Sequence, residues 1–422
     1  MRGMTSFFIT VLVSLTVHAA KINTQCTKDA TTGVVEGVNV QTPFTIASVS
    51  KVFTTHWGIA EMGANYRYTT TVLITPVGQD LYDVHLQGSM FPYFDRTMYQ
   101  FLIGELNKLN VKKIHYLTYD EDFIYSSNMR INPSLAHGND EQTTIETMKD
   151  LRQDTTTINK DLTPLNAKAL ALEKMVLPKT LTLSISDIHF VSKRDFTPTA
   201  LTKGFTLKSS ELFRTLKEMN RNSHNYAAEN IYRKLARAED YDRFLQKELP
   251  GVPVSEIILY NGSGYPVTTD TAKLYNAASC RAVVEMMANL RQHMITNGLE
   301  FKDIVPVAGK DASDGESTVT QIYGNDKTNG VLMGKTGSVA DTIALAGMVS
   351  TNEHTTYFHT SFDVERTAAD REAAYKRIKD WVMNDLIGSD KKGDLNSYVP
   401  RSFLPFDSTS VLAPVTIIRK MH

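Results

Sequence analysis

Alternating apolar and polar positions indicate strands in several parts of the chain. Strands are predicted at 69–75, 81–86, 114–118 and 181–191. Further along, three strand-like segments at 331–337, 342–350 and 356–363 follow one another with only short turns between them. Because a short turn can join antiparallel strands but not parallel ones, these three segments predict an antiparallel meander.

Apolar residues that recur every three to four positions predict helices. The helical stretches lie at 51–63, 271–294 and 365–386, with a longer stretch from about 209 to 235 that breaks near Asn222. Two segments lack a strong period. Residues 139–174 are rich in threonine and charge and indicate an excursion from the main fold, whereas 309–330 indicate a polar, glycine-rich loop.

Length and charge narrow the class of protein. At 422 residues the chain is longer than a single hydrophobic core usually allows, so a large domain with an insertion, or two domains, is expected. A hydrophobic content of 42% is ordinary for a soluble globular protein. The 45 basic and 46 acidic residues nearly cancel, so no global field would attract nucleic acid or an anionic membrane surface. At most a peripheral membrane contact is expected.

The first 20 residues have the pattern of a signal peptide. Arg2 precedes an apolar run at 7–17, and small residues at Ala19 and Ala20 fit a cleavage site. The run is too short to span a bilayer, although a membrane anchor or a buried helix is the alternative. We therefore expect residues 1–20 to be removed and the mature protein to be exported to the periplasm.

The two cysteines leave one question open. Cys26 and Cys280 both follow the predicted signal peptide, and an oxidising compartment would allow them to pair. The sequence alone does not decide whether they do. Neither has a histidine nearby at ligand spacing, so no structural metal and no cofactor are predicted.

Three short motifs occur in an order that suits acyl-transfer chemistry: Ser48-Val49-Ser50-Lys51, Ser223-His224-Asn225 and Lys335-Thr336-Gly337. A serine hydroxyl is a weak nucleophile until a base takes its proton, and Lys51 is expected one helical turn from Ser48 on the same face. A lysine acts as that base only when burial or a second cation, such as Lys335, lowers its pKa. A backbone N–H at the start of the helix would also point toward the developing oxyanion.

Each motif alone is weak, because all three arise by chance in chains of this length. Ser48 could instead be a helix N-cap, and Ser223 with Asn225 could be a loop or capping pair. Lys335 could be an exposed lysine on a strand. The joint order favours the catalytic interpretation, since the first motif opens a predicted helix and the third lies on a strand of the meander.

The residues around these motifs resemble those of a known family. The matching stretches are Thr45-Ile46-Ala47-Ser48-Val49-Ser50-Lys51 and Leu332-Met333-Gly334-Lys335-Thr336-Gly337-Ser338, with further matches at 65–70, 261–264 and 306–309. They are similar to the low-molecular-mass class C penicillin-binding proteins, the D-Ala-D-Ala carboxypeptidase/endopeptidase family. The resemblance covers both ends of the mature chain and is patchy in the middle.

The resemblance implies an α/β (α+β) fold. A serine-β-lactamase/D,D-peptidase-like domain, with a central antiparallel sheet flanked by helices, would be interrupted by an inserted β-rich accessory domain. The catalytic domain would comprise 21–74 and 204–422, with 75–203 inserted. Larger family members carry two inserted domains. Because the interval here is too short for both, the outer one is expected to be missing or reduced to the threonine-rich segment.

The resemblance also implies a role for the residues of the first two motifs. Ser48 would be the acylated nucleophile, and Lys51 would be its general base. Ser223 would relay a proton to the leaving amine, with help from Lys51 or Lys335. Asn225 would hold Lys51 and the substrate amide in place.

The third motif would bind substrate. Lys335, Thr336 and Ser338 would bind the terminal carboxylate of the peptide, and Gly337 belongs to the same substrate-binding strand. Backbone N–H groups of Ser48 and Ser338 would form the oxyanion hole.

Two further residues have open interpretations. Asp120 falls where some family members have an aspartate that binds the amino end of a diamino-acid side chain, and a solvated turn carboxylate is the alternative. His224 stands where an aspartate or asparagine is more usual. A surface position away from the cleft is the favoured interpretation of His224, and tuning of the pH profile is the other.

The function implied is that of a penicillin-sensitive serine D,D-peptidase. It would hydrolyse D-alanyl bonds of peptidoglycan stem peptides as an endopeptidase, a carboxypeptidase or both, and β-lactams would be covalent inhibitors. A penicillin-binding sensor or scaffold that acylates without turnover is one alternative, and a serine β-lactamase is another. A module that only binds peptidoglycan would leave the three motifs unexplained. Oligomeric state is not predicted.

Overall fold

A computed structural model describes residues 21–126, 158–311, 317–389, 395 and 398–417. The predicted signal peptide and most of the threonine-rich segment therefore lie outside the described residues. Within the described ranges, no helix combines the length and the apolar character needed to cross a membrane.

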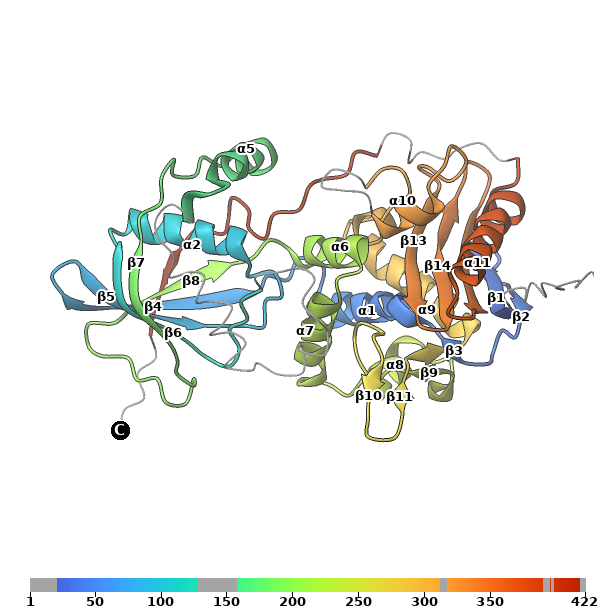
Figure 1. Cartoon of the computed structure of the whole chain (residues 1–422), viewed down its shortest axis with the longest axis horizontal. Helices are drawn as coiled ribbons and strands as arrows, with labels where there is room; N and C mark the ends of the chain where they lie inside the picture. Colours follow the sequence, from blue (N-terminus) through green and yellow to red (C-terminus); the bar gives the residue numbers. More distant parts are fainter. Residues whose placement is uncertain (1–20, 127–157, 312–316, 390–394, 396–397, 418–422) are drawn as a thin grey trace, which may run out of the picture.

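Helices gather in two places along the molecule (Figure 1). The longer ones are α1 (Ser50–Met62), α2 (Arg96–Lys108), α5 (Leu162–Glu173), α6 (Leu212–Asn222), α7 (Asn225–Ala236), α8 (Tyr241–Glu248), α9 (Cys280–Thr296), α10 (Thr318–Tyr323) and α11 (Ala368–Trp381). Shorter helical turns are η1 (Ala47–Val49), η4 (Val254–Glu256), η5 (Phe301–Asp303) and the π-helical turn η6 (Val382–Ile387). Helices α6, α7 and α9 pack around α1, which is buried from Ser50 to Ile59.

The first large sheet contains the predicted meander. Its strands, in spatial order, are β13 (Leu332–Val339), β14 (Thr342–Ser350), β15 (Thr355–Asp363), β1 (Lys21–Asp29) and β2 (Val35–Val38). Every neighbouring pair is antiparallel, so the meander is confirmed. Strand β1 pairs with β15, and the beginning of the described chain therefore completes a sheet formed by its later part (Figure 1).

Both faces of this sheet are buried. On β14, Leu345 packs in an apolar cluster with Ile378 of α11. Its neighbour Ala346 belongs instead to the main core, together with Val284 of α9. Because successive side chains of a strand point to opposite faces, α11 covers one face of the sheet and α9 the other. The predicted central antiparallel sheet flanked by helices is thus confirmed.

The second large sheet is mixed. Its spatial order is β16 (Ala413–Val415), β8 (Lys203–Lys208), β4 (Thr69–Gly78), β5 (Leu81–Gln87), β6 (Lys113–Tyr119) and β7 (Ser184–Phe190). The pairs β5–β6 and β6–β7 are parallel, and the others are antiparallel. Strands β4 and β8 are neighbours, so the chain between them leaves and re-enters at adjacent strands. The expected boundary between residues 74 and 75 falls inside β4, and β16 brings the C-terminal tail back to this sheet.

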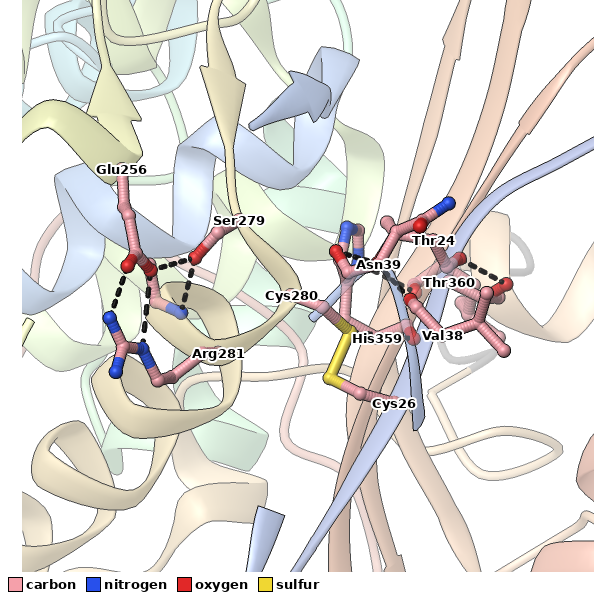
Figure 2. The surroundings of a disulfide bond; sticks show 12 residues. Thr24, Cys26, Val38, Asn39, Glu256, Ser279, Cys280, Arg281, His359 and Thr360 are labelled. Carbon is pink, nitrogen blue, oxygen red and sulfur yellow. Dashed lines mark hydrogen bonds and ion pairs between the residues drawn. A yellow bond between two sulfur atoms is a disulfide. The ribbon is translucent and has the colours of Figure 1, made fainter. Parts of the chain in front are cut away.

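A disulfide joins Cys26 to Cys280 and settles the question that the sequence left open (Figure 2). Cys26 lies on β1, and Cys280 is the first residue of α9. The preceding residue, Ser279, caps α9 by accepting a hydrogen bond from the N–H of Ala282 at 3.0 Å. The hydroxyl of Ser279 also donates to Glu256 at 2.5 Å. The bond therefore attaches the N-terminal strand to a helix whose start is held in place independently.

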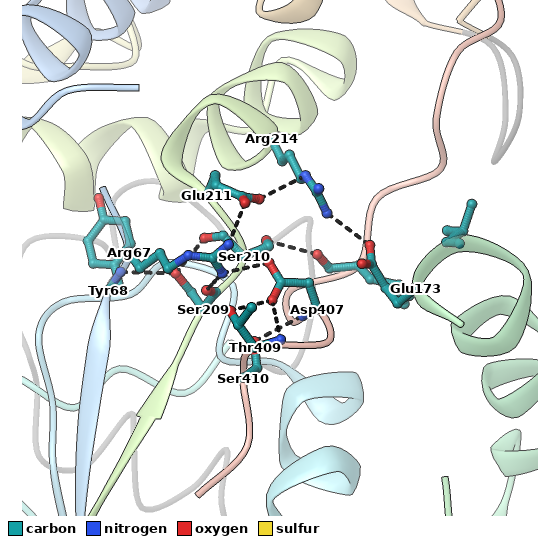
Figure 3. A network of polar contacts seen from close by, with 12 residues as sticks. Arg67, Tyr68, Glu173, Ser209, Ser210, Glu211, Arg214, Asp407, Thr409 and Ser410 are labelled. Atoms are coloured by element: carbon teal, nitrogen blue, oxygen red, sulfur yellow. Dashed lines mark hydrogen bonds and ion pairs between the residues drawn. The ribbon is translucent and has the colours of Figure 1, made fainter. Parts of the chain in front are cut away.

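A network of charged groups joins the segment before β4 to α5, α6 and the C-terminal tail (Figure 3). Arg67 donates to a carboxylate oxygen of Asp407 at 2.5 Å and pairs with Glu211. Arg214 pairs with Glu211 at 3.0 Å and with Glu173 of α5 at 2.8 Å. All five side chains are at most one-fifth exposed, so these charges are largely removed from water.

Some predicted boundaries were wrong. The helix predicted at 271–294 begins only at Cys280, because short strands β11 (Lys273–Leu274) and β12 (Ala277–Ala278) precede it. These pair with β10 (Val267–Thr268) and with β3 (Phe44–Thr45) and β9 (Ile257–Ile258) respectively. The loop predicted at 309–330 contains helix α10. The start of the 271–294 segment pairs with strands that are distant in the sequence, and local apolar spacing does not reveal such pairing.

Candidate active site

Ser48 sits in a tight turn at the entrance to α1. It is half-buried, whereas Ala47 and Val49 on either side are fully buried. Ala47 has a φ of 47°, a left-handed conformation that is costly for a residue with a side chain. The hydroxyl of Ser50 donates to the carbonyl of Ala47 at 2.6 Å and helps to hold this turn. The strained turn therefore leaves Ser48 partly exposed between two fully buried neighbours.

Lys51 is completely buried beside Ser48. Its Nζ lies 3.0 Å from Ser48 Oγ, 2.6 Å from Asn225 Oδ1 and 2.8 Å from the carbonyl oxygen of Ser263. Burial lowers the pKa of Lys51 to about 7, although the carboxylate of Glu229 acts in the opposite direction. The amine therefore loses its proton easily near neutral pH.

The second motif occupies the junction between α6 and α7. Ser223 ends α6 with a φ of 53°, and Asn225 is the first residue of α7. This sharp change of direction points Asn225 toward Lys51 and brings the Ser223 hydroxyl to 2.9 Å from Lys335 Nζ. The break that the sequence predicted near Asn222 is thus the corner between α6 and α7.

The third motif lies on β13, which runs beside the Ser48 turn. Lys335 is fully buried, and it donates to Ser223 and to the carbonyl of Thr336 at 2.8 Å. Burial and the nearby charge of Lys51 lower the pKa of Lys335 well below its usual range. A side chain on Gly337 would collide with the carbonyl of Ile46, so glycine allows the strand to approach the turn closely.

The remaining residues of that strand extend the site toward solvent. Thr336 shares a hydrogen bond with the hydroxyl of Thr318 at 3.0 Å. Ser338 is exposed, and its hydroxyl accepts a hydrogen bond from the guanidinium of Arg371. Lys335, Thr336, Ser338 and Arg371 thus bring an amine, two hydroxyl groups and a guanidinium to this part of the site, a set of groups suited to binding an anion.

The favoured surface position of His224 was wrong. The side chain is only 3% exposed, and its Nδ1 accepts the N–H of Ala227 at 3.0 Å as the N-cap of α7. Burial, together with the charge of Lys51, lowers the pKa of His224 to about 4. The imidazole is therefore neutral at pH 7 and carries its proton on Nε2.

Asp120 is buried in a loop and is not hydrogen-bonded to the motif residues. Its Oδ1 accepts the N–H groups of Gly88 at 2.8 Å and of Asp122 at 3.1 Å, and its Oδ2 has no partner within the described residues. The side chain is 1% exposed, and burial raises its pKa to about 6. The alternative interpretation, a solvated turn carboxylate, was wrong. Arg237, which follows the last residue of α7, pairs with Asp122 at 2.6 Å and attaches this loop to the end of the helix that starts at Asn225.

The structure adds two residues that motif reasoning did not assign. The carbonyl of Ser263 binds Lys51, and Glu229 accepts the N–H groups of Gly262 at 3.3 Å and of Ser263 at 3.1 Å. The stretch at 261–264 was noted as a match to the family, which was a signal for the turn. Nothing in the sequence pointed to Glu229, because a buried carboxylate within a helix has no motif of its own.

The comparisons with known proteins identify the family. A model of the D-Ala-D-Ala carboxypeptidase 3 (S13) family matches residues 194–384. This match confirms the predicted resemblance to the D-Ala-D-Ala carboxypeptidase/endopeptidase family over that part of the chain. The predicted enzyme class, a serine-type D-Ala-D-Ala carboxypeptidase/endopeptidase, is therefore confirmed. No curated protein sequence matches the chain.

Solved structures agree with the S13 assignment. A predatory peptidoglycan endopeptidase from Bdellovibrio bacteriovorus is 29% identical, with a TM-score of 0.84 over 94% of this chain and 100% of the other. A second predatory endopeptidase of that organism, solved with an immunity protein, is 29% identical, with a TM-score of 0.83 over 93% and 100%. Penicillin-binding protein 4 from Haemophilus influenzae is 14% identical, with a TM-score of 0.60 over 87% and 97%, and shows the shared fold. The first of these relatives has also been solved acylated by penicillin G.

Proposed function

We propose that this S13 enzyme hydrolyses D-alanyl peptide bonds of peptidoglycan through an acyl-enzyme on Ser48. The observation that carries the proposal is the 3.0 Å contact between Lys51 Nζ and Ser48 Oγ, made by a lysine whose pKa is lowered to about 7. A nucleophile and a base within hydrogen-bond reach, with the base oriented by further groups, are the minimum that acyl transfer requires.

The contacts of Lys51 define the direction of proton transfer. A neutral amine has two N–H donors and one lone pair. The acceptors Asn225 Oδ1 and Ser263 O use both donors, which leaves the lone pair for the hydroxyl of Ser48. Ser48 Oγ then attacks the carbonyl carbon of the substrate while its proton passes to Lys51. Asn225 and Ser263 stabilise the resulting ammonium by charge-assisted hydrogen bonds.

Collapse of the tetrahedral intermediate needs a proton for the departing amine. Ser223 is placed for this step, because Lys335 donates to its hydroxyl at 2.9 Å and leaves the Ser223 proton free to pass to the leaving nitrogen. The C–N bond breaks, and the acyl group remains esterified to Ser48. Ser223 then takes up a proton from Lys51, directly or through Lys335, so Lys51 is neutral again. A water molecule attacks the ester while one of its protons passes to Lys51, and Lys51 returns this proton to Ser48 Oγ as the ester C–O bond breaks.

Substrate would lie along β13. The terminal carboxylate would bind to Lys335, Thr336 and Ser338, where hydroxyl groups and positive charge coincide. Backbone N–H groups of Ser48 and Ser338 would form the oxyanion hole. Gly337 keeps the strand close to the nucleophile turn, so that substrate, nucleophile and oxyanion donors fit within one short stretch.

Cleavage of cross-links is the activity that the similarity favours. The relative at 29% identity is a peptidoglycan endopeptidase and is covered over its whole length. An endopeptidase must hold a second stem peptide, whose diamino acid carries an amino group. We assign Asp120 to that amino group, because a carboxylate with one unpartnered oxygen is suited to binding a cation.

The proposed function also bears on the domain organisation and the cellular location of the protein. We infer that residues 75–203, most of which build the second sheet and its helices, form an accessory domain inserted into the catalytic domain of 21–74 and 204–422. The continuous strand β4 and the return of β16 mean that the two domains share one sheet at their junction. Peptidoglycan lies outside the cytoplasm, so export to the periplasm is the location that this substrate requires.

The test is a digest of purified peptidoglycan sacculi. Protein beginning at Lys21, and the variants Ser48→Ala and Lys51→Met, are incubated with sacculi, and the released muropeptides are separated. Loss of cross-linked dimers is expected for the unaltered enzyme, with no change for either variant. Lys376→Met is a matched control, because Lys376 is exposed on α11 and pairs with Asp380 at 2.6 Å, away from the three motifs.

The alternatives predict different results. Loss of terminal D-alanine without loss of dimers would make the enzyme a carboxypeptidase. Covalent labelling of Ser48 by penicillin with unchanged muropeptides would indicate a sensor or scaffold. Rapid hydrolysis of penicillin itself would indicate a β-lactamase. Digestion that persists in Ser48→Ala would exclude Ser48 as the nucleophile.

A further inference from the structure

A second cluster of titratable side chains lies where α1, α8 and α9 meet. His56 comes from α1, Glu248 is the last residue of α8, and His293 lies in the last turn of α9. One ring nitrogen of each histidine and one carboxylate oxygen of Glu248 all lie within 4.8 Å of one another. None of these three residues takes part in the proposed catalytic steps.

The surroundings of His56 fix its tautomer. Its Nε2 lies 2.7 Å from Asn289 Oδ1, and Asn289 Nδ2 donates to the backbone carbonyl of Glu248 at 3.1 Å. The second contact requires the nitrogen of the Asn289 amide to face Glu248, so its oxygen faces His56. An amide oxygen only accepts hydrogen bonds, and the proton of His56 therefore sits on Nε2.

The other ring nitrogen of His56 is left as a buried acceptor. The residue is 0% exposed, and Nδ1 has no hydrogen-bond partner among the described residues. An unsatisfied polar atom in the core is costly and calls for an explanation. Histidines that bind metals commonly show this arrangement, with one nitrogen donating to an oxygen and the other free to coordinate.

The other two residues provide a suitable donor set and a route for an ion. His293 Nε2 and Glu248 Oε2 are 2.8 Å apart, and their side chains are 29% and 13% exposed. Two imidazole nitrogens with one carboxylate oxygen form a ligand set that zinc accepts, with water in the fourth position. Magnesium and calcium prefer oxygen ligands, so they are poor candidates for this site.

We propose that His56, Glu248 and His293 bind a zinc ion. Donor atoms in a tetrahedral zinc site are about 3.4 Å apart, since each lies at about 2.0–2.1 Å from the metal. The partly exposed side chains of Glu248 and His293 would move inward toward the fixed His56. Zinc would replace the proton that His293 shares with Glu248. The ion would connect α1, α8 and α9, and α1 is the helix that begins beside Ser48.

Metal content and spectroscopy test the proposal. Protein without a histidine tag is loaded with ZnCl₂, freed of excess metal and analysed for zinc, and a parallel sample is loaded with Co²⁺. About one zinc ion per chain and visible Co²⁺ absorption bands of a tetrahedral site are expected, together with a higher Tm in zinc than in EDTA. His293→Gln and Glu248→Gln should each lower zinc affinity at least about tenfold. Both variants keep a hydrogen bond between positions 248 and 293 within reach, which limits damage to the fold.

Two further variants sharpen the result. Asn289→Ala removes the group that orients His56 and should weaken zinc binding about tenfold or more. His189→Gln is the control, because His189 and Asp187 form a partly exposed pair at 3.0 Å outside the cluster, and this variant should bind zinc as the unaltered protein does. Circular dichroism in EDTA checks that each variant is folded. Absence of zinc in the unaltered protein, or equal zinc affinity in folded His293→Gln and Glu248→Gln, would overturn the proposal.

Discussion

At the scale of single residues, the charge of Lys51 should control the rate of acylation. Its amine must be neutral to accept the proton of Ser48, and its pKa is lowered to about 7. The rate of labelling by a fluorescent penicillin should therefore rise as the pH increases from about 6 to about 8. Lys51→Met should slow labelling at least about 100-fold. Stopped-flow measurements would show this, and a rate that stays constant across the range would contradict the role of Lys51.

Asp120 should affect peptide substrates and leave penicillin unaffected. We expect Asp120→Asn to raise KM for a cross-linked dimer about tenfold, because a neutral amide loses the attraction to an amino group. Acylation by penicillin should change little, since Asp120 has no hydrogen bond to the motif residues. Measuring both reactions on one preparation separates the two effects. Equal losses in both would show that the variant disturbs the fold, and unchanged KM would exclude the assigned contact.

His224 links the site to the acid stability of the protein. Its pKa is lowered to about 4 in the folded state, while an unfolded histidine has a pKa of about 6.5. Between these values the unfolded chain binds the proton more readily, so stability falls as the pH drops through this window. His224→Asn keeps a good N-cap and cannot titrate.

His224→Asn should change how strongly the Tm of the protein depends on pH. The loss of Tm between about pH 7 and about pH 5 should be smaller in His224→Asn than in the unaltered protein. His115→Asn serves as the control, because His115 is 40% exposed and pairs with Asp83. An identical acid loss in the His224 variant would show that its imidazole does not contribute to acid unfolding.

The sequence indicated those site residues that lie together in a short motif. Ser48, Lys51, Ser223, Asn225 and Lys335 could be proposed because each motif places chemistry at a fixed spacing. In the structure Lys51 contacts Ser48 and Asn225, and Lys335 contacts Ser223. Other contributors could not be found in this way. The carbonyl of Ser263 is a backbone group, and the residues of the proposed zinc site are distributed over three helices, so no local pattern marks either.

At the scale of elements, the boundaries that local sequence patterns determine were predicted correctly, and those that depend on distant partners were not. Helix α1 and strands β13 to β15 have strong periods of their own and appeared where expected. The first residues of the predicted 271–294 helix form short strands, because partners at 44–45 and 257–258 are available only in the folded chain. The burial of His224 has the same origin, since Tyr93, from the segment between β5 and α2, packs against its ring with ring centroids 5.3 Å apart.

The disulfide should stabilise the folded protein by holding strand β1 in place. Cys26 and Cys280 are separated by 254 positions, so the bond restricts the unfolded chain over a long loop. We expect Cys26→Ala/Cys280→Ala to lose about 2–5 kcal/mol of unfolding free energy, measured by urea denaturation. The double substitution avoids a free thiol. Stability equal to that of the unaltered protein, measured with intact disulfide, would show that β1 is held by its strand pairing alone.

At the scale of the whole molecule, the lobe built on the first large sheet and the lobe built on the second, called the accessory lobe here, are connected by more than the chain crossings. The tail returns to the second sheet through β16, and Phe406 stacks on Phe101 of α2 with ring centroids 4.2 Å apart. Next to this stack, Asp407 accepts a hydrogen bond from the guanidinium of Arg67, which lies in the segment just before β4. The accessory lobe is therefore tied at a point close to the start of α6, whose far end carries Ser223.

Arg67 is the residue on which this connection depends most. Burial alone would raise the pKa of Asp407, but hydrogen bonds from Arg67 and Thr409 outweigh it and keep the pKa low. Arg67→Met would leave Asp407, whose side chain is 4% exposed, without its cation. Removing one partner of a buried ion pair typically costs about 3–5 kcal/mol, and the remaining exposure of Arg67 places the expected loss at the lower end, about 3 kcal/mol.

The double variant Arg67→Met/Asp407→Leu distinguishes a lost pair from an uncompensated charge. If the penalty comes from the isolated carboxylate, the double variant should be more stable than Arg67→Met alone. Arg194→Met is the control for loss of an arginine, because Arg194 is 88% exposed. Thermal unfolding followed by tryptophan fluorescence, which reports on the lobe that holds Trp57 and Trp381, and by far-UV circular dichroism, which reports on both lobes, would also show whether Arg67→Met separates one transition into two. A single transition with unchanged Tm in Arg67→Met would mean that backbone pairing through β8 and β16, and not this charge, holds the lobes together.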